Sequence, residues 1–139
     1  MRNRDLARDH VRRAKARLRA LDVLFDAESW ADVVRESQEI VELTLKALLR
    51  TSMIEPPRVH DVSDVLHTHR EQLPAVLEPE INALAAISRD LRRDRELAFY
   101  GAEDLTPSDF YTREDAERAR NGARKVVELV APHVEDGSS

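Results

Sequence analysis

Apolar residues recur every three or four positions along almost the whole chain, which is the spacing of one face of an α-helix. No stretch alternates apolar and polar residues for long enough to predict a β-strand. The pattern therefore predicts an all-α chain, folded as a five-helix antiparallel up-and-down bundle with short connections. The predicted helices span about residues 4–25, 30–51, 61–72, 76 or 79 to 100, and 112–132.

The second predicted helix has the broadest apolar face. Its apolar and small positions cover more than half of its circumference, so this helix is predicted to be the central and most buried one. These positions are Trp30, Val33, Val34, Ser37, Ile40, Val41, Thr44, Leu45, Leu48 and Leu49.

Helix starts are marked by hydroxyl residues with an acid three positions later. Ser29 precedes Asp32, and Thr112 precedes Asp115. Both pairs predict reciprocal N-terminal caps, in which each side chain bonds the backbone N–H of the other residue.

Prolines mark the remaining boundaries. Pro57 follows the second helix, because proline cannot continue a helix. Pro79 suits a position in the first turn of the fourth helix, and Pro132 is expected to end the fifth. Asp61 is expected to start the short third helix.

The length of 139 residues predicts a single domain over residues 1–139, with a core of about 5–132 and a frayed tail at 135–139. The chain has no cysteine, which excludes disulfides and thiol catalysis and fits the reducing cytoplasm, where we expect the protein to reside. No apolar run approaches the ~20 residues that span a membrane, and the arginine-rich start is unlike a signal peptide.

The net charge is −5, from 22 basic and 27 acidic residues, but it is unevenly spread. Residues 2–19 are strongly basic, and their arginines occupy the polar face of the first predicted helix. Two interpretations stay open for this face: a solvated surface, which is the commoner case, or an RNA-binding surface.

A second concentration of arginine lies in the last turns of the fourth predicted helix, which is expected to stop at Gly101. Its apolar stripe runs through Leu77, Ile81, Leu84, Ser88, Leu91, Arg95 and Ala98, so it turns polar toward its end. Buried arginine needs a carboxylate partner or a bound anion. Ion pairing within the bundle and an anion-binding groove are both open, with Arg92, Arg93, Arg95, Tyr100 and His60 as candidate ligand-binding residues.

Most familiar catalytic patterns are absent. The three glycines are isolated, so no phosphate-binding loop is formed. A di-metal carboxylate bundle needs paired Glu-x-x-His motifs, and the nearest approach is a single Asp64-x-x-His67. We therefore predict no metal site and no cofactor.

Four segments together resemble the HEPN family. Residues 34–49 (VRESQEIVELTLKALL) are similar to the second helix of HEPN domains, and 56–62 (PPRVHDV) to the entry to their third. Residues 93–101 (RDRELAFYG) and 111–116 (YTREDA) are similar to the end of the fourth helix and the start of the fifth. The resemblance covers roughly residues 5–132.

The resemblance implies a small helical bundle that forms a homodimer. Many HEPN proteins are metal-independent ribonucleases, in which an arginine and, after four to six intervening residues, a histidine face their copies across the dimer. Others accompany a minimal nucleotidyltransferase, often as a toxin–antitoxin pair, or bind nucleotides or RNA without cutting.

The motif transfers only in part. Arg93 matches the arginine and Asp94 the polar residue that commonly follows it, but Phe99 stands where the histidine should be. Phenylalanine can neither take nor give a proton, and acid–base catalysis contributes typically ~10²–10⁴-fold. Tyr100 is adjacent, but its ordinary pKa near ~10 makes it a poor base. We therefore expect a member without ribonuclease activity.

Three functional hypotheses remain. The first is a non-catalytic module that binds a nucleotide, RNA or a nucleotidyltransferase partner, with no DNA-specific motif. The second is a ribonuclease toxin that uses Arg93 and Asp94 with Tyr100 or His60 as an unusual proton carrier. The third is a structural interaction protein whose arginines only form salt bridges.

Overall fold

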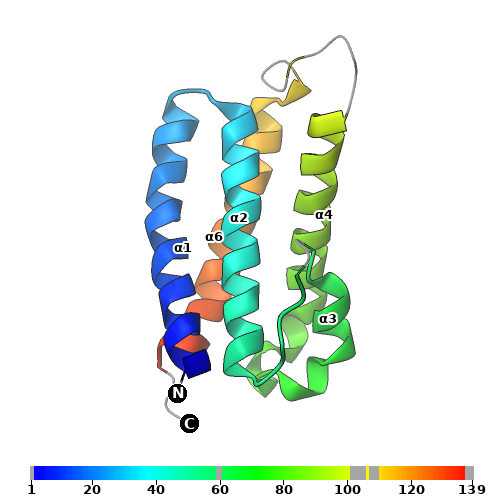
Figure 1. Cartoon of the computed structure of the whole chain (residues 1–139). Helices are drawn as coiled ribbons and strands as arrows, with labels where there is room; N and C mark the ends of the chain where they lie inside the picture. Colours follow the sequence, from blue (N-terminus) through cyan, green and yellow to red (C-terminus); the bar gives the residue numbers. More distant parts are fainter. Residues whose placement is uncertain (1, 59–60, 101–105, 107–109, 137–139) are drawn as a thin grey trace.

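The chain folds into a helical bundle, seen in the computed structural model of Figure 1. The structure describes residues 2–58, 61–100, 106 and 110–136, and the side chains of all these except 94–100. Its α-helices are α1 (Arg2–Asp26), α2 (Trp30–Thr51), α3 (Ser63–Thr68), α4 (Ile81–Tyr100) and α6 (Arg113–Glu135). Within these described ranges there is no β-strand, so the prediction of an all-α antiparallel bundle is confirmed.

The central position of α2 is confirmed as well. This helix packs against α1, α4 and α6, and both α1 and α4 run antiparallel to it (Figure 1). The apolar face predicted from its spacing is buried almost throughout, because three helices cover it. Its buried residues are Val33, Val34, Ser37, Gln38, Ile40, Val41, Thr44, Leu45, Ala47, Leu48 and Leu49.

The two N-terminal caps have different outcomes. Thr112 and Asp115 form the predicted reciprocal cap of α6, with N–H···O distances of 2.9 and 3.2 Å. The cap predicted at Ser29 is wrong, because the Ser29 hydroxyl donates to the Asp32 carboxylate at 2.6 Å and bonds no backbone N–H. Ser29 has ψ 72°, which is not the extended backbone that a capping serine needs.

Helices α1 and α2 both end in a left-handed residue that is not glycine. Glu28 has φ 59° and Met53 has φ 63°. In each case the next amide bonds a carbonyl five residues back, Ser29 to Leu24 at 3.0 Å and Ile54 to Leu49 at 2.8 Å. These are Schellman ends, which satisfy the last carbonyls of a helix.

Two predicted boundaries need correction. The third helix was expected to run to residue 72, but α3 ends at Thr68 and a separate 3₁₀ turn, η1, covers Arg70–Gln72. The fourth α-helix starts only at Ile81, because Pro79 lies in a 3₁₀ segment, η2 (Ala75–Glu80). Proline disfavours the α conformation of the residue before it, so the regular helix begins after it.

The end of the last helix also differs from expectation. Pro132 was predicted to end it, yet α6 continues to Glu135. Val134 is 2% exposed, so the final turn is held by burial although proline removes one backbone hydrogen bond. Residues 137–139 of the predicted frayed tail lie outside the described residues.

Helices α4 and α6 meet at Gly122. A Cβ atom there would lie 3.2 Å from Cγ2 of Ile87, so the missing side chain lets the two helices approach closely. No helix in the described part of the chain combines the length and the apolar character needed to cross a bilayer.

Candidate functional site

The arginines at the end of α4 are the first candidate site. Arg92 is half-buried, and the side chain of Arg93 is 65% exposed. Nη2 of Arg93 lies 3.9 Å from Oδ1 of Asp90, one turn earlier on the same helix. A pair so long and exposed contributes well under ~1 kcal/mol.

The structure describes only some of the other candidate ligand-binding residues. The backbone of α4 is helical to Tyr100, which puts Arg92, Arg95 and Phe99 on one face of the helix by their spacing. The side chains of Asp94, Arg95, Phe99 and Tyr100 lie outside the described part, as does His60.

Ser88 fixes the segment that leads into α3 against the middle of α4. Its side chain is buried, at 3% exposed. Its hydroxyl accepts a hydrogen bond from Val62 N at 3.2 Å and donates one to Oδ1 of Asp61 at 3.1 Å. The same carboxylate oxygen accepts from Ser63 N at 2.9 Å.

This junction bears on the arginine site through helix geometry. Ser88 and Arg92 are four positions apart, so they share a face of α4. Asp61 and Val62 are therefore held about one turn from Arg92. The signal for the junction was present in the sequence, since Ser88 interrupts an apolar stripe, but its partner Asp61 was expected only to start a helix.

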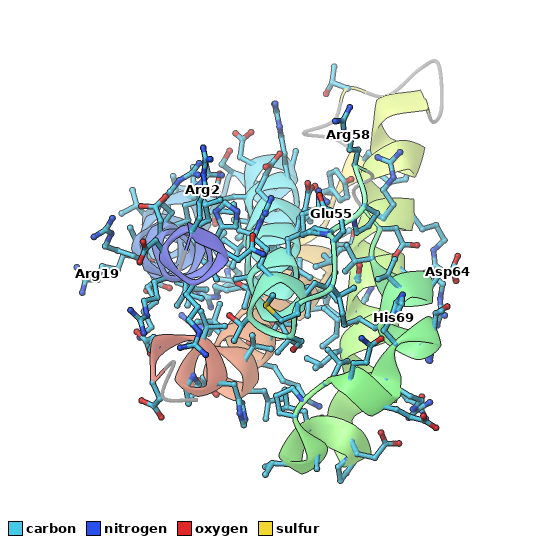
Figure 2. The ribbon with its side chains drawn as sticks, turned by 60° about the horizontal axis from the view of Figure 1, so that its bottom comes forward. Arg2, Arg19, Glu55, Arg58, Asp64 and His69 are labelled. Carbon is cyan, nitrogen blue, oxygen red and sulfur yellow. The ribbon has the colours of Figure 1, made fainter. Side chains whose placement is uncertain are left out.

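The two basic regions of the chain lie on opposite sides of α2 within one molecule. Helices α1 and α4 stand at opposite edges of the bundle in Figure 1, and both pack on α2. In Figure 2, Arg2 and Arg19 extend from the α1 side, whereas Arg58, Asp64 and His69 lie on the side of α3 and α4. Within a single molecule, the arginine face of α1 and the end of α4 therefore do not form one continuous basic surface.

Part of the α1 basic face is paired with carboxylates. Arg12 bonds Asp9 at 2.7 Å, and Lys15 bonds Glu135 at 2.5 Å across to the end of α6. These side chains are between 41% and 80% exposed, so the pairs are solvated and weak.

The histidine and carboxylate pair considered for metal binding is exposed on α3. Asp64 and His67 both face solvent. His69 is half-buried, and its Nδ1 lies 2.6 Å from Oε1 of Gln72. In the portion of the chain that is described, no three histidine, aspartate or glutamate side chains gather as a metal ion would require.

Comparison with known proteins supports the family resemblance. The family model of the HEPN domain matches residues 7–134, which is nearly the whole chain. Searches of curated proteins and of solved structures gave no significant match.

Proposed function

The chain belongs to the HEPN family, which supports a nucleotide- or RNA-related role in general, and from that premise we propose a non-catalytic binding module. Arg93 and its neighbouring arginines at the end of α4 bind the phosphate of a nucleotide or of RNA, and a minimal nucleotidyltransferase is the protein partner. The system is a two-component, toxin–antitoxin type of pair. The chain acts as a homodimer, in which two copies of the site face each other.

The residue at position 99 carries this proposal. Attack by a ribose 2′-hydroxyl on the neighbouring phosphate needs proton transfer as well as charge stabilisation. Arg93 supplies a planar guanidinium suited to holding phosphate, and it is accessible on the last turns of α4. Phe99 supplies no proton carrier where the family motif has histidine. Binding without cleavage is the chemistry that remains.

The test measures binding and cleavage on the same preparation. Single-stranded RNA is titrated with the protein in chelator at several salt concentrations, and the RNA is then examined for breaks. We expect intact RNA and an affinity that falls as salt rises, because phosphate contacts release counterions. Arg93→Ala should weaken binding roughly tenfold, the loss of one charged hydrogen-bonding contact.

Arg12→Ala is the matched control. Arg12 is also exposed and also paired with an aspartate three positions away, but it lies on α1. If both variants lost RNA affinity equally, the binding site could not be assigned to the end of α4. RNA cleavage that disappears in Arg93→Ala would instead establish the ribonuclease, with Tyr100 or His60 as candidate proton carriers.

Unchanged binding of RNA, nucleotides and the nucleotidyltransferase in Arg93→Ala and Arg95→Ala would favour a purely structural role for these arginines. Dimer formation is tested separately, by measuring the molar mass in solution by light scattering. A monomer at micromolar concentration would contradict the symmetric site.

A further inference from the structure

A second arginine, at the other end of the bundle, lacks the partner that a half-buried guanidinium needs. Arg50 is in the last turn of α2, and its Nη1 lies 3.5 Å from Oδ1 of Asn3 on α1. This is a long contact to a neutral amide. Its Nε is buried and has no hydrogen-bond partner, and no carboxylate in the described part of the chain lies within ion-pair distance.

Another arginine in the seam between α1 and α2, Arg17, has carboxylate partners. Arg17 lies further along the seam, and its side chain is 34% exposed. It bonds Glu36 at 3.1 Å and lies 4.0 Å from Glu39. Arg17 is therefore paired with carboxylates, whereas the contact of Arg50 is with a neutral amide.

Three cationic side chains act on a histidine in the same seam. His10 on α1 is half-buried, and its Nδ1 is buried without a hydrogen-bond partner. Burial lowers the pKa of His10, and the charges of Arg50, Arg13 and Lys46 lower it further. We call Asn3, His10, Arg13, Lys46 and Arg50 the His10–Arg50 cluster.

Two carboxylates from the packed helices reduce this charge without cancelling it. Glu42 on α2 bonds Lys46 at 2.9 Å, and Asp9 on α1 bonds Arg12 at 2.7 Å on the outer side. Asp9 has only a small opposing effect on His10, since the net influence is a lowered pKa. A half-buried guanidinium without an anion costs free energy, and a bound anion offsets that cost.

We propose that the His10–Arg50 cluster binds a phosphate group. Phosphate suits this cluster because the Arg50 guanidinium and the His10 imidazole each have a buried nitrogen without a hydrogen-bond partner among the described residues. A tetrahedral anion can accept from several donors at once. The phosphate belongs either to a small phosphorylated molecule or to a nucleic-acid backbone. In Figure 1 this end of α1 and α2 lies at the bottom of the bundle, remote from the last turns of α4.

Binding of an anion at this cluster is expected to be coupled to the protonation of His10. An anion beside His10 favours the imidazolium, so the pKa of His10 rises on binding and a proton is taken up. For a given ionic form of phosphate, the affinity therefore increases as the pH is lowered.

The experiment follows the His10 ring by NMR while the full chain is titrated with inorganic phosphate, and in parallel with a short single-stranded RNA. Sodium chloride at matched ionic strength is the reference. We expect phosphate to raise the pKa of His10 and chloride to leave it unchanged. A response to RNA alone assigns the cluster to a nucleic-acid backbone, and a response to inorganic phosphate assigns it to small phosphorylated ligands.

Three variants separate this site from its surroundings. Arg50→Ala should weaken phosphate binding about tenfold or more, as expected for a lost charged hydrogen bond. Arg50→Lys should recover part of it, and Arg19→Ala, an exposed arginine on α1, should bind as the parent does. Circular dichroism checks that each variant is folded.

Equal responses to phosphate and chloride, or full binding by folded Arg50→Ala, would overturn the proposal. Arg93→Ala should leave the His10 response intact. The outcome is therefore independent of whether the end of α4 binds RNA.

Discussion

Ser88 and Asp61 are 27 positions apart in the chain and are joined by a hydrogen bond of 3.1 Å. Ser88 also accepts the N–H of Val62, whose side chain is fully buried. A single buried hydroxyl thus satisfies one backbone donor and holds one carboxylate at the start of α3. The position of the segment after the prolines, relative to α4, depends on this pair.

Ser88→Ala is expected to destabilise the protein by about 1–3 kcal/mol, the cost of leaving a buried backbone donor unsatisfied. The free energy of unfolding in urea measures it. Ser52→Ala is the control, because Ser52 caps the end of α2 with its backbone and no side-chain bond is recorded there. A loss below about 0.5 kcal/mol for Ser88→Ala would show that water replaces the hydroxyl.

The helices could be predicted from the sequence because their periodicity is a local property of the chain. The bounds of α2 and the cap at Thr112 were predicted correctly, since both depend on residues within one or two turns. The cap at Ser29 was not, because the left-handed Glu28 before it changes the direction of the chain. Such a backbone angle is set by the packing of α1 on α2, which a local pattern does not contain.

Contacts between helices near the candidate site could not be predicted from the sequence, for a related reason. The arginines of α4 were visible as a cluster in the sequence, and Arg93 is indeed on the surface. The contacts of Ser88 with Asp61 and of Arg50 with Asn3 join separate elements. Which faces of two helices meet is decided by side-chain packing over the whole bundle, so these pairs could not be read from spacing.

Met53→Gly is expected to stabilise the protein by up to ~1 kcal/mol. Met53 has φ 63°, a left-handed conformation that costs a residue with a Cβ atom roughly 1–2 kcal/mol, and its side chain is 77% exposed. Glycine removes that strain but adds flexibility to the unfolded chain, which reduces the gain.

Thermal unfolding measures the effect, and Met53→Ala is the matched control. Alanine removes the exposed side chain and keeps the Cβ atom, so it should leave stability nearly unchanged. Equal stabilisation by both substitutions would show that the side chain, rather than the backbone angle, is responsible.

Arg120 is expected to stabilise the junction of α1 and α6 through an aromatic ring. Its guanidinium carbon lies 3.7 Å from the centre of the Phe25 ring, and its Nη1 lies 3.2 Å from Asp22. The side chain is 18% exposed, so this cation–π contact is partly desolvated and contributes up to ~2 kcal/mol. Arg120→Ala should lose about that amount in urea unfolding.

Arg124→Ala is the control for Arg120, because Arg124 bonds the same Asp22 at 2.6 Å and does not stack on the Phe25 ring. Its side chain is 41% exposed, and its loss should stay below ~1 kcal/mol. Arg120→Lys should recover little, since an ammonium group cannot stack as a plane. Equal losses at Arg120 and Arg124 would contradict a contribution from Phe25.

The free energy of unfolding is expected to depend on pH through His10. Burial, with help from Arg50, lowers the pKa of His10 in the folded protein, so the unfolded chain binds this proton more readily. The stability that comes from keeping His10 neutral is complete above its ordinary value of 6.5. It is lost as the pH falls from there toward the lowered pKa, with a slope of at most ~1.4 kcal/mol per pH unit for one proton.

His10→Gln removes this titration and should flatten the dependence of the unfolding free energy between pH 7.5 and 5.5. The measurement compares variant and parent at each pH in a buffer without phosphate, because phosphate at the proposed cluster would raise the pKa of His10. Asp9, whose pKa is lowered chiefly by its hydrogen bond from Arg12, titrates below this window and stays charged throughout. Parallel curves for His10→Gln and the parent would show that the imidazole is not held neutral by its surroundings.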